Sequence, residues 1–264
     1  MSKLQIIGGG KMGEALLAGL IGQGWATEDQ LAVVEKETGR AEALRAGFPG
    51  IAVVAEPAAA AGHVIAVKPP DVFAVCAALK ALRDRAPVLS IAAGVTIGTM
   101  EGALAPTTPV VRAMPNTAAL VGASASAVAF GQHTTDEHVT WAEEILGAVG
   151  TVVQVTESLL DAVTGLSGSG PAYLLLVLES MIDGGVHAGL ARPDAAALAT
   201  QTLVGVGKML AETGEPPVLL RASVTSPAGT TAAGVRELER GGVRAALIDA
   251  VLAATERSRE LGLG

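Results

Sequence analysis

The sequence is short of residues that several protein classes require. It has two tryptophans, one tyrosine, three phenylalanines and a single cysteine, Cys76, among 264 residues. One cysteine excludes a disulfide framework and a cysteine-ligated zinc site, and we expect Cys76 to be a small buried residue. None of the four histidines has a metal-ligand spacing, so we predict no metal site.

Positive charge and long membrane-type segments are also scarce. The formal net charge is −8, which is unfavourable for a protein that binds nucleic acid through phosphates. The longest run without charge, 113–135, contains Pro115, Asn116 and Gln132 and is a poor membrane helix. The apolar start of the chain is too short for a signal peptide. We therefore expect a cytoplasmic protein that binds neither nucleic acid nor a membrane.

Aliphatic residues and glycine are abundant instead. Hydrophobic residues make up 50% of the chain and glycine 33 positions, which excludes a disordered chain. Short apolar runs alternate with helical patterns in the first part, and these runs predict strands over 4–7, 31–34, 51–54, 63–67, 88–92 and 110–111. The alternation is typical of an α/β, Rossmann-like fold with a doubly wound parallel sheet.

The second part reads as helical throughout. The pattern predicts helices over 171–190, 193–212, 230–240 and 243–260, without strands. We place the boundary near 157, which gives a dinucleotide-binding domain, 1–157, and an all-α domain, 158–264. Its helices are apolar on more than one face, and such helices need cover on all sides. We therefore expect two copies to pair through them as a homodimer.

A glycine motif opens the chain. Gly8, Gly9, Gly10, Lys11, Met12 and Gly13 form Gly-x-Gly-x-x-Gly between the first predicted strand and the first predicted helix. The first glycine permits a tight turn, the second lets a pyrophosphate approach the backbone, and the third lets the helix pack closely on the strand. The context predicts dinucleotide binding.

Residues after the second strand bear on which dinucleotide binds. Glu35 lies there, about 20 residues after the glycines, where an acidic group bonds the ribose 2′-hydroxyl of NAD. Lys36 and Arg40 follow, and a basic residue is what the 2′-phosphate of NADP requires. These residues leave the choice open.

Two later strand ends and one helix start carry further candidates. Lys68 and Asn116, the only asparagine in the chain, follow strands, where ligand-binding loops emerge in doubly wound sheets; Lys68 fits a surface lysine equally well. The hydroxyl-rich segment Ser226–Thr231 precedes a predicted helix. It could bind a carboxylate through free backbone N–H groups or simply cap the helix.

Taken together, these blocks resemble the pyrroline-5-carboxylate reductase family along nearly the whole chain. The resemblance is carried by the glycine loop and by four further segments, Ala66–Pro69, Ser90–Thr96, Val111–Thr117 and Leu160–Tyr173, together with Ser226–Thr231. It implies reduction of a cyclic imine to L-proline with NAD(P)H, more commonly NADPH. It also implies a homodimer and a larger ring such as a decamer.

The resemblance also implies roles for individual residues. For the cofactor these are Gly8, Gly9, Gly10, Lys11, Met12, Gly13, Glu35, Lys36, Val67, Lys68, Pro69, Ala92, Ala93 and Asn116. For the substrate they are Ser226, Gly229, Thr230 and Thr231. Thr231 resembles the family threonine whose hydroxyl hydrogen-bonds the ring nitrogen, and it is our candidate catalytic residue.

The sequence departs from the family at one position, and two other functions are possible. The family usually has glycine where this chain has Ala228, which makes a positive φ less comfortable there. A β-hydroxyacid dehydrogenase-like reductase would need a lysine soon after Ser167–Gly170, and none occurs before Lys208. A nucleotide-sensing binding protein without turnover is the other alternative.

Overall fold

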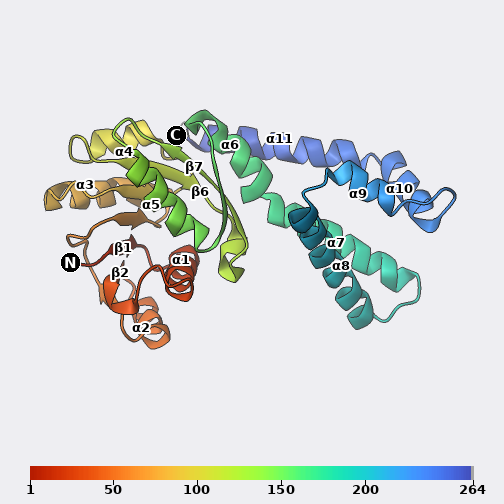
Figure 1. Ribbon diagram of the computed structural model, residues 1–264, viewed down its shortest axis with the longest axis horizontal. Helices are drawn as coiled ribbons and strands as arrows, with labels where there is room; N and C mark the ends of the chain where they lie inside the picture. Colours follow the sequence, from red (N-terminus) through yellow and green to blue (C-terminus); the bar gives the residue numbers. More distant parts are fainter. Residues whose placement is uncertain (263–264) are drawn as a thin grey trace. The chain divides into compact units, whose positions relative to one another are not determined.

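The computed structural model describes residues 1–262 (Figure 1). They form two compact units: Met1–Ser169 with the residues from Leu252 onward, and Gly170–Val251. The compact division comes after Ser169 rather than near 157 because α6 (Leu160–Val163) packs on the first unit, where Leu160 is buried in the core. The boundary near 157 between two independently folding domains stays a prediction.

One sheet organises the first unit. Its strand order is β3-β2-β1-β4-β5-β6-β7-β8. The strands are β1 (Leu4–Ile7), β2 (Leu31–Val34), β3 (Ala52–Val54), β4 (His63–Ile65), β5 (Val88–Ser90), β6 (Val110–Met114), β7 (Ser124–Phe130) and β8 (Gly150–Gln154). Strands β1 to β6 pair in parallel, as predicted, so their carboxyl ends share one edge.

The prediction missed the two strands at the end of this sheet. β7 runs antiparallel to β6, and β8 runs parallel to β7. In β7 the residues are mostly small, Ser-Ala-Ser-Ala-Val-Ala-Phe, and few of them are the β-branched or aromatic types that mark a strand in a sequence. Burial against α5 (Asp136–Gly147) and pairing with β6 hold this segment extended instead.

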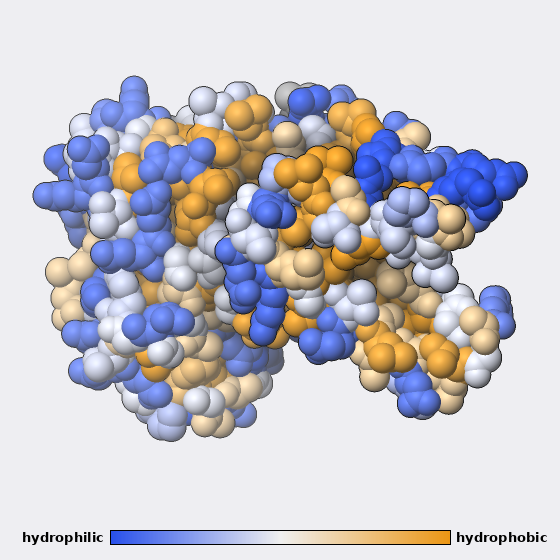
Figure 2. Space-filling view, turned by 45° about the vertical axis from the view of Figure 1, so that its right-hand side comes forward, coloured by the Kyte–Doolittle hydropathy of each residue, from blue (hydrophilic) through white to orange (hydrophobic). Residues whose placement is uncertain are grey.

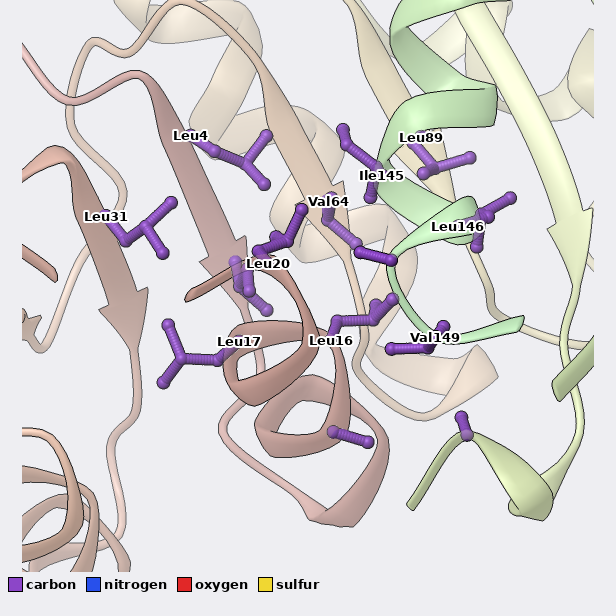
Figure 3. Packing of buried hydrophobic residues seen from close by; sticks show 14 of the residues in the cluster. Leu4, Leu16, Leu17, Leu20, Leu31, Val64, Leu89, Ile145, Leu146 and Val149 are labelled. Carbon is purple, nitrogen blue, oxygen red and sulfur yellow. The ribbon is translucent and has the colours of Figure 1, made fainter. Parts of the chain in front are cut away.

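Helices cover both faces of the sheet. They are α1 (Lys11–Gly22), α2 (Thr38–Gly47), α3 (Val72–Leu82), α4 (Ile97–Ala103) and α5. Leu4 points to the face that packs against α1 and α5 (Figure 3), and Ile6 belongs to the same cluster, whereas Ile7 belongs to the cluster on the face covered by α3 and α4. This alternation follows from the two-residue period of a strand. Cys76 is buried on α3, as expected, and burial raises the pKa of its thiol to about 11.

The second unit is helical but has almost no interior of its own. It contains α7 (Gly170–His187), α8 (Arg192–Thr213), α9 (Pro217–Ser223), α10 (Thr230–Arg240) and the first part of α11 (Val243–Gly262). Within residues 170–251 only Ala195 and Ala199 are buried. Many leucines, valines and methionines stay exposed, and Figure 2 shows hydrophobic side chains gathered over these helices. In the described part of the chain, no helix has the length and apolar composition needed to cross a membrane.

A buried histidine makes the stability of the first unit depend on pH. His63 on β4 is 1% exposed, its Nε2 lies 3.3 Å from Asp84 Oδ2, and its Nδ1 has no hydrogen-bond partner within residues 1–262. Burial lowers the pKa of this imidazole below its ordinary 6.5, and the contact with Asp84 opposes that shift only in part. The folded state therefore favours the neutral ring.

We expect acid to destabilise the protein through His63. Below about pH 6.5 the unfolded chain protonates this residue more readily than the folded chain does, so stability falls as the pH falls toward the lowered folded pKa. Melting temperatures at pH 7.5 and 5.5 should show a smaller drop for His63→Gln than for the wild type. His133→Gln, on a loop of the same unit, is the control and should keep the full drop. Equal drops in all three proteins would contradict the prediction.

Candidate functional site

The glycine loop connects β1 to α1 at the carboxyl edge of the sheet. Gly8 has φ +110°, and a Cβ there would lie 2.6 Å from the carbonyl oxygen of Ala66, at the end of β4. A Cβ at Gly13 would overlap the carbonyl oxygen of Gly8. Glycine is therefore required at both positions for the strand and the helix to come this close.

Gly10 is different, because the space beside it is open. It is the N-cap residue of α1, it is exposed, and a Cβ there would meet nothing within 4 Å. No side chain caps this helix, so its first backbone N–H groups are available to an anion. Lys11 follows, exposed, and no ion pair to it occurs in the described residues. This arrangement fits a dinucleotide pyrophosphate.

Glu35 lies directly beside this loop. One oxygen of its carboxylate accepts a hydrogen bond from the Gly9 N–H at 3.0 Å, and the other accepts from the Glu37 N–H at 2.9 Å. Arg40 donates to the Gly9 carbonyl oxygen and pairs with Glu14 at 2.6 Å. Sequence reasoning missed Glu14, because an acidic residue in the first turn of a helix ordinarily only complements the helix dipole.

The candidates that follow β4 and β5 lie at the same edge. Val67 is half-buried against the core, whereas Lys68 and Pro69 are exposed, and Lys68 has no ion pair within residues 1–262. Ala92 is buried, so only its backbone can meet a ligand, and Ala93 is exposed.

A cavity of about 330 Å³ lies beside these loops, in the first unit. Its lining includes Pro69, Ala93 and Gly94 from the strand ends. Thr164 and Ser169, which border the π-helical turn Thr164–Gly168, line it as well. Because the cavity adjoins two predicted cofactor residues, it has the position of a ligand pocket at the carboxyl edge.

Asn116 has internal hydrogen bonds. Its Oδ1 accepts from the N–H groups of Ala118 and Ala125, and its Nδ2 donates to the Ser167 carbonyl oxygen at 3.0 Å. The side chain therefore ties the end of β6 to the turn Thr164–Gly168. Direct contact between Asn116 and the cofactor stays a prediction.

The Ser226–Thr231 segment lies in the second unit, at the start of α10. Gly229 is the N-cap of α10, and no side chain caps this helix. Ser226, Thr230 and Thr231 are exposed, and no hydrogen bond from their hydroxyls is found in the described part of the chain. The N-terminus of α10 therefore presents backbone N–H groups and hydroxyls together, which suits a carboxylate. The alternative that Thr231 caps the helix finds no support in this geometry.

Ala228 has a positive φ, the backbone conformation that favours the glycine usual at this position in the family. Its φ is +58°, a region that costs a residue with a Cβ about 1–2 kcal/mol. We expect Ala228→Gly to stabilise the protein by about 0.5–1 kcal/mol, because relief of the cost of the positive φ exceeds the extra entropy that glycine loses on folding. Thermal unfolding should show a higher melting temperature. The matched control, Ala222→Gly in α9, should lower it; a lower melting temperature for Ala228→Gly as well would contradict the prediction.

Sequence comparison gives matches along the whole chain. The pyrroline-5-carboxylate reductase dimerisation family matches residues 157–261, and the family described as NADP oxidoreductase coenzyme F420-dependent matches residues 3–94. A pyrroline-5-carboxylate reductase of Methanosarcina acetivorans is 46% identical, covering 98% of each chain. One of Mycobacterium tuberculosis is 45% identical, covering 99% of this chain and 97% of its own.

Solved structures agree. A pyrroline-5-carboxylate reductase of Coxiella burnetii has a TM-score of 0.93 at 34% identity and covers 98% of each chain. The Plasmodium falciparum enzyme with NADP bound has a TM-score of 0.85 at 28% identity, covering 99% of this chain and 98% of that one. The similarity thus extends over both units.

Proposed function

The chain belongs to the pyrroline-5-carboxylate reductase family, and on that premise we propose that it reduces pyrroline-5-carboxylate to L-proline with a nicotinamide dinucleotide. The observation that carries the proposal is the full-length identity of 46% with a reductase of this name. The glycine loop supports it physically, because it offers an open helix N-terminus for the pyrophosphate.

The first unit would hold the cofactor. The backbone of Gly10 and Lys11 would bind the pyrophosphate, Gly9 would hold the Glu35 carboxylate beside it, and Glu35 would meet the adenosine ribose. Val67, Lys68, Pro69, Ala92 and Ala93 would lie along the remainder, toward the nicotinamide. When bound, the nicotinamide supplies the hydride. The family resemblance favours NADPH, whose 2′-phosphate Lys36 or Arg40 would meet, whereas Glu35 argues for NADH.

The segment Ser226–Thr231 would hold the substrate. The open N–H groups of α10 and the hydroxyls of Ser226 and Thr230 would bind the carboxylate, and the Thr231 hydroxyl would orient the ring nitrogen. A protonated imine already carries the positive charge that makes its carbon electrophilic, so no general acid is needed during hydride transfer. The side chains then contribute mainly by positioning the substrate.

Oxidation of NADH or NADPH followed at 340 nm tests this function. Addition of pyrroline-5-carboxylate should start the oxidation, with proline as the product. A β-hydroxy acid with oxidised cofactor should give no turnover. Dinucleotide binding without turnover would favour the nucleotide-sensing alternative and overturn the proposal.

We also propose that the helical unit pairs two copies of the chain, and that dimers assemble further into a ring such as a decamer. The support is the near absence of buried side chains within residues 170–251, together with the match to a dimerisation family. Light scattering at micromolar concentration should give at least the mass of a dimer. A fully active monomer would contradict the pairing.

A further inference from the structure

We propose that the loop after α3 forms a second anion site, separate from the dinucleotide site, which binds a small ligand that carries a di- or triphosphate group. The site is a cavity of about 500 Å³ in the first unit, lined by Lys80, Ala81, Arg83, Arg85, Ala105 and Pro106. Three of these side chains are cationic and none is acidic, although the whole chain has a formal net charge of −8.

The cavity lies at the edge of the sheet opposite the glycine loop. α3 follows β4 at the carboxyl edge and ends at Leu82, shortly before β5 begins at Val88. α4 ends at Ala103, and Ala105 and Pro106 lead back to the start of β6, which is parallel to β5. The two helices pack side by side (Figure 1). A ligand in this cavity would therefore lie at the amino edge, away from the predicted cofactor residues.

The three cations of the cavity are free to bind a ligand. Lys80, Arg83 and Arg85 are exposed, and within residues 1–262 they have no ion pair and no side-chain hydrogen bond. Every other arginine of these residues has one or the other. Cations are favourable at a helix C-terminus, but neither guanidinium donates to a carbonyl oxygen of α3. Both can therefore bind a phosphate through two parallel hydrogen bonds.

The backbone around the cavity has an unfavourable conformation at three positions. Arg83, the C-cap of α3, has φ +58°, and Arg85 has φ +54°. Thr107, directly after Pro106, has φ +68°. Glycine or asparagine usually occupies such positions. Unfavourable backbone conformations of this kind are concentrated where proteins hold ligands, so the presence of arginine at two of these positions favours a binding role.

Asp84, between the two arginines, fixes the loop from the inside. Its Oδ2 lies 3.3 Å from Nε2 of the buried His63, and its Oδ1 accepts a hydrogen bond from the Ala86 N–H at 3.3 Å. The side chain is only 19% exposed and does not line the cavity. Because Asp84 is held against the sheet, Arg83 and Arg85 stay at the surface on either side of it.

The arrangement of the cations indicates the class of ligand. Two guanidinium groups and an ammonium group can bind more than one phosphate at a time, whereas a single phosphate or carboxylate would leave part of the site unused. The volume lies within the range of small-molecule sites, about 300–1,000 Å³. Both a free polyphosphate and the triphosphate of a nucleotide have the required chemistry.

Calorimetric titration of the whole protein tests the proposal. NADPH is kept in excess, so that the glycine loop is occupied, and divalent metals are left out because polyphosphates chelate them. Tripolyphosphate should bind at least tenfold more tightly than inorganic phosphate, and its affinity should fall as salt is added. ATP and tripolyphosphate of equal affinity would identify a free polyphosphate as sufficient, and tighter binding of ATP would identify a nucleotide.

Variants assign the binding to this loop. Arg83→Asn and Arg85→Asn remove one charge each, and asparagine adopts a positive φ more readily than arginine does. Each should weaken tripolyphosphate binding about tenfold without lowering the melting temperature. Arg83→Lys keeps the charge and should retain more affinity than Arg83→Asn. Lys208→Gln removes an exposed cation of the second unit and should leave the affinity unchanged.

Two results would overturn the proposal. The first is the absence of saturable tripolyphosphate binding while NADPH is present. The second is binding that persists unchanged in both asparagine variants, because the anion would then lie elsewhere. Neither result bears on the proposed function, since no residue that lines this cavity belongs to the predicted cofactor or substrate site.

Discussion

Thr231→Ala should lower kcat/KM for pyrroline-5-carboxylate roughly 10- to 150-fold. On the role proposed for Thr231, the lost interaction would be a hydrogen bond between its hydroxyl and a ring nitrogen that shares the positive charge of the protonated imine. Such a bond contributes about 1.5–3 kcal/mol, and transition-state arithmetic converts this energy to that range of rates. Thr231 lies on the exposed start of α10 and has no competing hydrogen bond among the described residues.

Stability measurements distinguish this role from a structural one. Because Gly229, and not Thr231, is the N-cap of α10, the substitution should leave the melting temperature nearly unchanged. Dinucleotide affinity should also be unchanged, since the glycine loop lies in the other unit. Thr231→Ser restores a hydroxyl and should recover most of the activity. Wild-type kinetics in Thr231→Ala would refute the catalytic role.

Gly10→Ala should weaken dinucleotide binding roughly 10- to 100-fold, a loss of about 1.4–2.8 kcal/mol, while leaving the fold intact. The Cβ of an alanine would meet no protein atom within 4 Å, so the folded chain can accept it. It would instead occupy the space in which a pyrophosphate has to approach the backbone. Calorimetric titration with NADH and NADPH, together with thermal unfolding, measures both effects.

Gly22→Ala is the matched control for this variant. Gly22 ends the same helix, and a Cβ there also meets nothing within 4 Å. Its replacement should leave dinucleotide affinity unchanged. If Gly10→Ala binds the dinucleotide as tightly as Gly22→Ala does, the pyrophosphate does not lie over Gly10.

The parallel part of the sheet and most helices could be predicted from the sequence. β1 and β2 have the bounds expected from their apolar runs, and α10 covers the predicted residues 230–240. The prediction holds for these elements because β1 and β2 are buried along their whole length and α10 has no buried residue. β7 could not be predicted in this way, since its small residues carry little strand preference and tertiary packing decides their conformation.

The residue types of the site could be predicted from the sequence, but the hydrogen bonds and ion pairs between them could not. The glycine spacing indicated a phosphate cradle, and Gly8 and Gly13 are needed where the motif requires them. Nothing in the sequence indicated that Glu35 bonds to Gly9, or that Arg40 is held by Glu14. These pairs join different elements of the fold, so their geometry exists only once the sheet has formed.

The sparsely buried helical unit also bears on how the protein is made. With the pairing of two copies proposed above, a newly synthesised chain would display the apolar side chains of α7 and α8 to water until a second copy covers them, and exposed apolar surface promotes aggregation. The yield of folded protein then depends on how quickly two chains meet, a step that is second order in chain concentration. Slow expression would give fewer encounters between partners, and dilution would lower thermal stability, because the association free energy contributes to it.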